Sequence, residues 1–167
     1  DLNWVGRLIR KDGTSKEVDL MPKILSKEAT NISVVLKTDG SAEGKIRRQL
    51  SEYDAFEFRK ENGDTNSDLY LEKLESSSNN IEISDYAREN DLDSTKPIVE
   101  SYSFKDTKSV EIINDKIYIS PMLFLAAKEN PFKQEIREYP VDFGYPMLNK
   151  YNINLEIPQG YIVESIP

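Results

Sequence analysis

The fold is decided by residues 31–50, NISVVLKTDGSAEGKIRRQL. Apolar residues fall on every second position on both sides of the turn signal Asp39-Gly40, as expected for two strands of a hairpin. These residues are Ile32, Val34, Leu36, Ala42, Ile46 and Leu50. The alternation places Lys45, Arg47 and Gln49 on the opposite face. The stretch therefore predicts a sheet with one face on a core and the other in water.

Strand patterns continue on both sides of this hairpin. They lie in residues 2–20 and in residues 81–166, where Ile136–Phe143 and Tyr161–Ile166 are expected to be strands. Two helices are expected, from Ser51 to a left-handed stop at Asn62-Gly63 and from Ser67 to Ser76. The helices follow each other between strands. The pattern therefore favours an α+β, mainly antiparallel chain of about nine strands, β-sandwich-like with a short two-helix insertion.

The chain divides into two parts by these patterns. Residues 1–25 predict a strand or hairpin at the junction with a missing upstream core, with a turn at Lys11-Asp12-Gly13-Thr14. Residues 26–167 predict the β-sandwich-like domain, which we expect to be truncated at its C-terminus. The apolar run Pro121–Ala127 is too short to span a membrane and is expected in the core.

The composition excludes several kinds of site. The 167 residues include no Cys and no His, so thiol nucleophiles, His-based triads and zinc sites built from these residues are excluded within the chain. A formal net charge of −8 at pH 7 disfavours nucleic acid and anionic lipid as partners. We therefore expect no catalytic residue, no metal, no cofactor, no nucleic-acid binding and no membrane span.

One segment imitates a calcium-binding loop. Asp64, Asn66, Asp68 and Glu75 have the spacing of the loop's ligands, but Leu69 stands where the sharp turn requires Gly. Helix caps and a solvated helix face explain these residues better than a metal site.

Three other groups of side chains and the single residue Trp4 are candidates for chemistry or contact. The thirty acidic residues could include a glycosidase-like carboxylate pair, although solvated strand faces and loops explain them without one. Lys45, Arg47 and Arg48 form a compact basic patch, which we interpret as surface charge balance. Tyr139, Phe143 and Tyr145 could form an aromatic surface for sugar or peptide, and core packing is the alternative. Trp4, near the expected junction, is a candidate for domain contact.

Several motifs resemble a family of bacterial modules. They are Ile117–Phe124, Lys128–Lys133, Arg137–Gly144 and Ile157–Tyr161, with Leu36–Gly44 and Tyr53–Ala55 upstream. They are similar to the C-terminal β-sandwich domain of unknown function that follows the transglutaminase-like, papain-like core in exported multidomain proteins of Gram-negative bacteria. These motifs are structural and carry no chemistry.

The resemblance implies a non-catalytic accessory domain of a secreted protein, located in the periplasm or at the cell surface. Its partner would be the neighbouring transglutaminase-like domain of the same polypeptide, which would carry any catalysis. An independent glycan- or peptide-binding module and a carboxylate-based hydrolase remain as alternatives. The sequence leaves the oligomeric state open, and an unpaired sheet edge could recruit a second copy.

Overall fold

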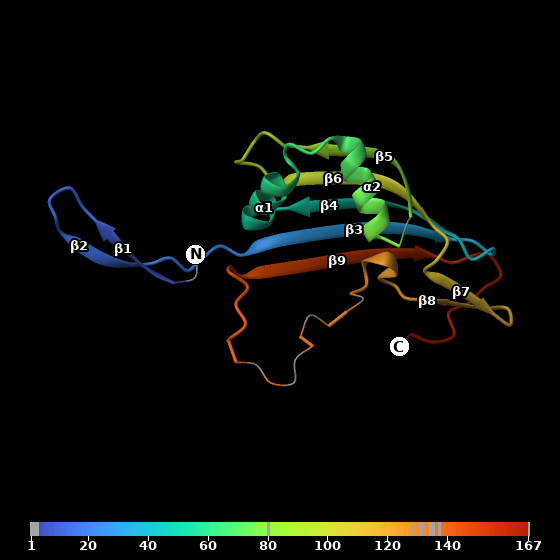
Figure 1. Cartoon of the computed structure of the whole chain (residues 1–167). Helices are drawn as coiled ribbons and strands as arrows, with labels where there is room; N and C mark the ends of the chain where they lie inside the picture. The colour runs from blue at the N-terminus through green and yellow to red at the C-terminus, as the bar shows by residue number, and fades with distance from the viewer. Residues whose placement is uncertain are drawn as a thin grey trace.

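The computed structural model describes residues 4–79, 81–127, 129–130, 132–133, 136 and 138–166 (Figure 1). Its centre is a five-stranded sheet in the order β5-β6-β4-β3-β9. The strands are β3 (Ser26–Leu36), β4 (Ala42–Leu50), β5 (Glu82–Glu89), β6 (Ile98–Asp106) and β9 (Met147–Glu156). Neighbouring strands pair antiparallel except β3 and β9, which pair in parallel. The hairpin at Asp39-Gly40 is confirmed, and Gly40 has the positive φ of 85° that its turn requires.

Two helices follow β4 and lie across one face of the sheet (Figure 1). They are α1 (Glu52–Asn62) and α2 (Ser67–Ser77), close to the expected ranges. The Tyr53 backbone N–H, in the first turn of α1, donates to the Ser26 hydroxyl of β3 at 3.0 Å. The left-handed stop expected at Gly63 is wrong, since its φ is −60°. A Gly63 N–H bond to the Arg59 carbonyl continues the helical pattern through that residue.

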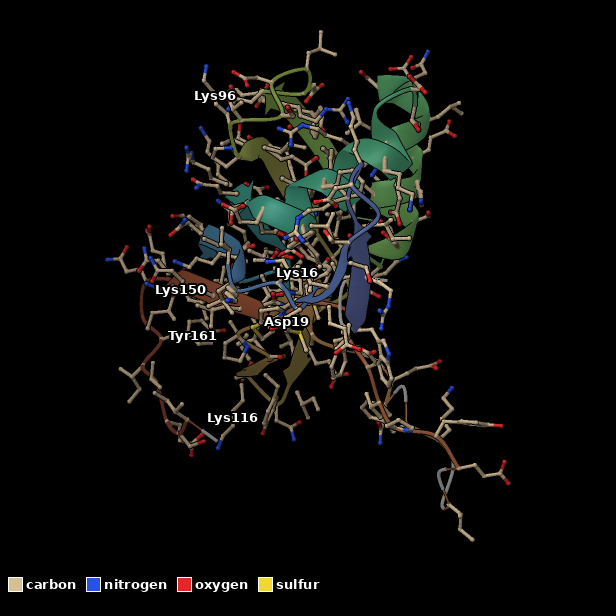
Figure 2. The ribbon with its side chains drawn as sticks, turned by 90° about the vertical axis from the view of Figure 1, so that its left-hand side faces the viewer. Lys16, Asp19, Lys96, Lys116, Lys150 and Tyr161 are labelled. Carbon is tan, nitrogen blue, oxygen red and sulfur yellow. The ribbon has the colours of Figure 1, made fainter. Side chains whose placement is uncertain are left out.

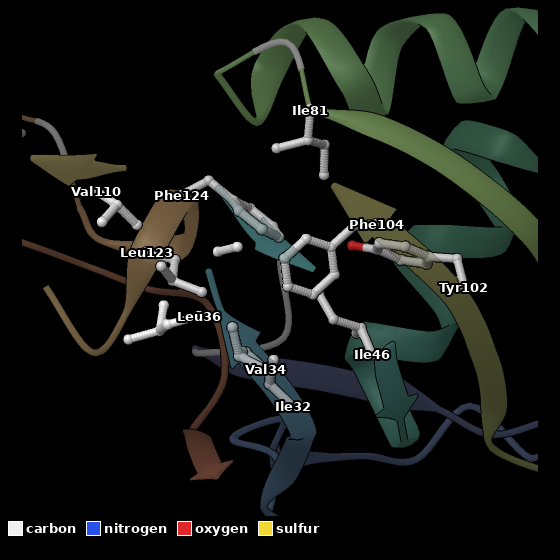
Figure 3. Close-up of a cluster of buried hydrophobic side chains, with 11 residues drawn as sticks. Ile32, Val34, Leu36, Ile46, Ile81, Tyr102, Phe104, Val110, Leu123 and Phe124 are labelled. Atoms are coloured by element: carbon white, nitrogen blue, oxygen red, sulfur yellow. The ribbon is translucent and has the colours of Figure 1, made fainter. Parts of the chain in front are cut away.

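The core lies between this sheet face and the segments that cover it (Figure 3). The alternating residues predicted to point inward are buried there, including Ile32, Val34 and Ile46. The 3₁₀ turn η1 (Leu123–Leu125) contributes Phe124, whose ring meets Phe104 edge-on at 5.0 Å between centroids. The apolar run from residue 121 to 127 thus supplies core residues, as predicted. Burying each such side chain contributes about 1.5–3 kcal/mol.

Two hairpins lie outside the main sheet. β1 (Val5–Ile9) pairs with β2 (Ser15–Asp19), and β7 (Val110–Ile113) pairs with β8 (Lys116–Ile119). Asn114 and Asp115 join the second pair with φ values of 49° and 62°, and two left-handed residues suit a tight hairpin turn. The first hairpin extends beyond the end of the sheet (Figure 1).

The α+β class and the predominance of antiparallel pairing are confirmed, but the β-sandwich arrangement is not. The described residues form one open sheet with helices on one face, together with two separate hairpins. The helices occupy space that a facing sheet would need. The described parts of 136–143 and 161–166 contain no strand, because they pair with no other described segment. Pro140 also removes a backbone donor from the first of these segments. The division at residue 25 stays a prediction.

Candidate functional site

A cleft of about 280 Å³ lies among α1, α2 and the sheet. Its sheet side carries Glu28 of β3 and Arg48 of β4, and its helices contribute Asp54 and Tyr70. Tyr145, which precedes β9, also lines the cleft. The cleft combines charged groups from segments that lie far apart in the sequence.

Arg48 holds two carboxylates together beside the cleft. Its Nε donates to Glu28 Oε1 at 2.9 Å and its Nη2 to Glu28 Oε2 at 3.1 Å, a two-pronged pair of the kind that fixes both partners. Its Nη1 donates to Glu100 Oε2 at 3.5 Å. Burial alone would lower the pKa of Arg48, but the hydrogen bonds and charge of Glu28 outweigh it and raise the pKa. Arg48 therefore stays cationic.

Glu100 is the most deeply buried acid of this group, with 1% of its surface exposed. Its Oε1 accepts hydrogen bonds from the hydroxyls of Tyr70 and Tyr86, both at 2.7 Å. Burial and the neighbouring Glu100 raise the pKa of both tyrosines, so they remain protonated donors. A buried carboxylate satisfied by a cation and two hydroxyls links α2, β4, β5 and β6, a structural role.

Asp54 lines the cleft, and one of its two carboxylate oxygens lacks a hydrogen-bond partner. Its Oδ1 accepts from the Tyr145 hydroxyl at 3.1 Å, but its Oδ2 is buried without a hydrogen-bond partner. Desolvation raises the pKa of Asp54, and the Tyr145 hydrogen bond offsets part of that rise. Burial and the same bond raise the pKa of Tyr145 to about 12. The Tyr145 ring also stacks on Tyr53 at 5.0 Å between centroids.

The acids that the sheet contributes to this site are held by contacts within the chain. A glycosidase uses two carboxylates that exchange protons with substrate and water. Both oxygens of Glu28 accept from Arg48, and Glu100 is buried beneath its tyrosines. No second free carboxylate from the described part of the sheet therefore faces Asp54, and Glu57 and Glu61 of α1 also line the cleft.

The sequence interpretation of the basic patch needs correction. Lys45 and Arg47 lie exposed on the open face of the sheet, but Arg48 points to the helix-covered face and forms the ion pairs above. The sequence already indicated this orientation. Side chains at every second position of a strand share a face, so Arg48 lies on the same face as Ile46 and Leu50. The view that solvated faces explain the acidic residues is wrong for Glu100 and Asp106, which are buried.

Trp4 lies on the N-terminal hairpin and is 74% exposed. Its carbonyl accepts from the Leu20 N–H at 3.0 Å, which extends the β1–β2 ladder by one pair. The register puts Leu8 and Val18 on the same side of the hairpin as Trp4 and Leu20. We call this side the hairpin face and define it as Trp4, Gly6, Leu8, Lys16, Val18 and Leu20.

The three aromatic candidates are not gathered into one groove. Tyr139 and Phe143 are 80% and 64% exposed, while Tyr145 packs against Tyr53 and faces the cleft. In the described part of the chain, Tyr139 and Phe143 line neither this cleft nor two further hollows, one between the β3–β4 turn and residues 156–159 and one between α1 and residues 94–97.

Side chains of the calcium-like segment form hydrogen bonds to the backbone of α2 and β5. The Asn66 side chain accepts from the Asp68 N–H at 2.8 Å and caps α2. Glu75 Oε1 accepts from the Ile83 N–H at 2.8 Å. No group of three or more acidic side chains with metal-binding geometry occurs among the described residues. None of the described helices is long and apolar enough to cross a membrane.

Comparison with known families finds one relation. Residues 115–167 match the model of a family described as a domain of unknown function with a solved structure (DUF3858). The comparisons with curated proteins and with solved structures give no match. The match covers less than half of the chain. It supports the expected similarity to a domain of unknown function over this segment, and the association with a transglutaminase-like core stays a prediction.

Proposed function

We propose that this chain is a non-catalytic accessory module that contacts a neighbouring folded domain of the same polypeptide through its N-terminal hairpin. The observation that carries the proposal is the exposed hairpin face. Its apolar side chains lie on a two-stranded sheet separate from the main sheet. In Figure 2 the hairpin, with Lys16 and Asp19 labelled, lies toward the viewer.

Physical arguments support a docking role for this hairpin. The hydrogen bonds of its described residues stay within residues 4–21. An isolated two-stranded hairpin is marginally stable in water, and packing on another surface would stabilise it. A tryptophan beside aliphatic side chains is typical of the residues that dominate protein interfaces. The family resemblance supports a neighbouring domain, in the periplasm or at the cell surface, as the partner.

Trp4 is the single tryptophan of the chain and can report its own docking. In the isolated chain its fluorescence should have the long-wavelength emission of an exposed indole. In a polypeptide that includes the adjoining domain, the emission should move to shorter wavelength. Trp4→Ala should then weaken the domain contact by about 30-fold or more, as expected for an interface residue worth at least about 2 kcal/mol.

A matched control separates docking from folding. Ile162→Ala removes another exposed apolar side chain, distant in sequence from the hairpin, and should leave the contact unchanged. Limited proteolysis at residues 20–25 and the relative melting of the two domains measure the contact. An indole that stays exposed in the longer polypeptide, or equal protease resistance of Trp4→Ala and the parent, would reject the proposal.

A second candidate function is glycan or peptide binding by the exposed rings of Tyr139 and Phe143. Exposed aromatic rings can stack on sugars and on peptide side chains. Titrating the chain with cello- and chito-oligosaccharides while following the NMR signals of these rings tests it. Shifts that disappear in Tyr139→Ala support this function, and unchanged signals reject it.

A further inference from the structure

β9 (Met147–Glu156) forms one margin of the five-stranded sheet (Figure 1). It pairs with β3 on one side and with no other strand in the described ranges. Its side chains are exposed, except that Ile153 and Leu155 are half-buried against the core. Such an edge offers backbone N–H and C=O groups to a further strand.

The two edges of the sheet differ in how well they could accept a strand. β5, at the opposite edge, has a register shift between Ser84 and Ala87, and Asp85 within it has a φ of 53°. Such irregularities twist an edge away from pairing. β9 contains no Pro and runs in unbroken register with β3 from Met147 to Glu156. β9 is therefore the edge without this protection.

The sequence of β9 is complementary to itself when reversed about Ile153. Lys150 then lies opposite Glu156, Asn152 opposite Asn154, and Tyr151 opposite Leu155. Lys150, labelled in Figure 2, belongs to the open face of the sheet, as do Asn152, Asn154 and Glu156. Tyr151, Ile153 and Leu155 belong to the helix-covered face. Each opposing pair thus joins residues of like chemistry or of opposite charge on the same face.

We propose that β9 pairs antiparallel with β9 of a second copy about a two-fold axis at Ile153. The two five-stranded sheets then form one continuous sheet. The axis repeats the Lys150–Glu156 pair, so each dimer contains it twice. Opposite charges directly across an antiparallel pair are favourable, and like charges there are unfavourable.

Charge selects this register over its neighbours. A shift by one residue would place open-face side chains opposite helix-face side chains. Moving the axis by one residue to either side shifts the pairing by two, and Lys150 then faces Asn154 or Pro158 in place of Glu156. Pro158 cannot donate a ladder hydrogen bond. The axis at Ile153 gives Lys150 its acidic partner and keeps both faces matched.

Reversing the two charges tests the register. Sedimentation of the 167-residue chain at increasing concentration should show a monomer–dimer equilibrium. Lys150→Glu places Glu opposite Glu twice, and Glu156→Lys places Lys opposite Lys twice. Each single variant should weaken self-association by at least about tenfold. The double variant should restore it, because it exchanges the charges without changing their pairing.

Mixing the two single variants gives the sharpest result. A Lys150→Glu chain and a Glu156→Lys chain are complementary at both pairs. The mixture should therefore form heterodimers at concentrations at which each variant alone is monomeric. Trp4→Ala is the control and should leave self-association through β9 unchanged. It changes only the proposed hairpin contact, so the failure of one proposal can be distinguished from the failure of the other. Far-UV circular dichroism checks that each variant is folded.

Two outcomes would overturn the proposal. One is a monomer at every concentration, which would leave the β9 edge for a strand of another protein or for none. The other is a dimer that neither single variant weakens, which would place the interface elsewhere. Amide hydrogen exchange gives a second readout, since the amides within Lys150–Glu156 that point away from β3 should become more protected as the wild-type concentration rises.

Discussion

Arg48→Met should be among the most destabilising single changes on the sheet. It keeps much of the apolar stem and removes the guanidinium that contacts Glu28 at 2.9 and 3.1 Å and Glu100 at 3.5 Å. Removing one partner of a buried ion pair costs about 3–5 kcal/mol, because a buried charge is left uncompensated. Glu100 keeps its two tyrosine donors and the Arg48 side chain is 32% exposed, so we expect the lower end, about 3 kcal/mol.

Urea unfolding followed by far-UV circular dichroism measures this loss at pH 7. For a chain of this size, about 3 kcal/mol corresponds to a Tm lowered by about 6–12 °C. Arg47→Met is the matched control, since Arg47 is exposed on the other face and should change stability by less than about 0.5 kcal/mol. Adding Glu100→Gln to Arg48→Met should recover part of the loss. A loss below about 1 kcal/mol, or one equal to that of Arg47→Met, would refute the reasoning.

The remaining predictions concern Asp54 and Gly44. The pKa of Asp54 is raised above 3.8 in the folded chain, so the folded state holds this proton more tightly than the unfolded state and the ionised carboxylate lowers stability. Asp54→Asn should therefore increase the free energy of unfolding at pH 7, and this gain should vanish as the pH falls below 3.8. Asp64→Asn, at an exposed acid, is the control. A gain that does not change with pH, or that equals the gain of Asp64→Asn, contradicts the prediction. Gly44→Ala should cost at least about 1–3 kcal/mol in urea unfolding, because its Cβ would lie 2.7 Å from the Phe104 ring and closer still to the Ser33 carbonyl. Wild-type stability of this variant would show that β4 can shift without loss.

Local features of the chain were predictable where neighbours in sequence determine them. The β3–β4 hairpin follows from alternation around Asp39-Gly40. Both helices were found within about one residue of their ends. The apolar run of residues 121–127 was placed correctly in the core. The strands expected in residues 136–143 and 161–166 are absent from the described parts of these segments, because strand propensity alone does not supply a pairing surface.

The candidate site was only partly accessible from the sequence. Arg48 could have been assigned to the buried face by its parity with Ile46 and Leu50. Its partners could not, because Glu28 and Glu100 lie 20 and 52 residues away and only the pairing of β3, β4 and β6 brings them together. The contact between Tyr145 and Asp54 joins residues 91 positions apart.

Residue types and their spacing along the chain establish a folded, acidic, strand-rich protein without thiol or imidazole chemistry. They also show which side chains share a face of each strand. Periodicity establishes those faces because it acts over two to four residues. The arrangement in space, by contrast, shows an open sheet covered by two helices, with β9 joined in parallel to β3 and paired with no other described strand. Strand order depends on contacts between segments far apart in the sequence, and a local pattern does not specify which distant strand completes a sheet.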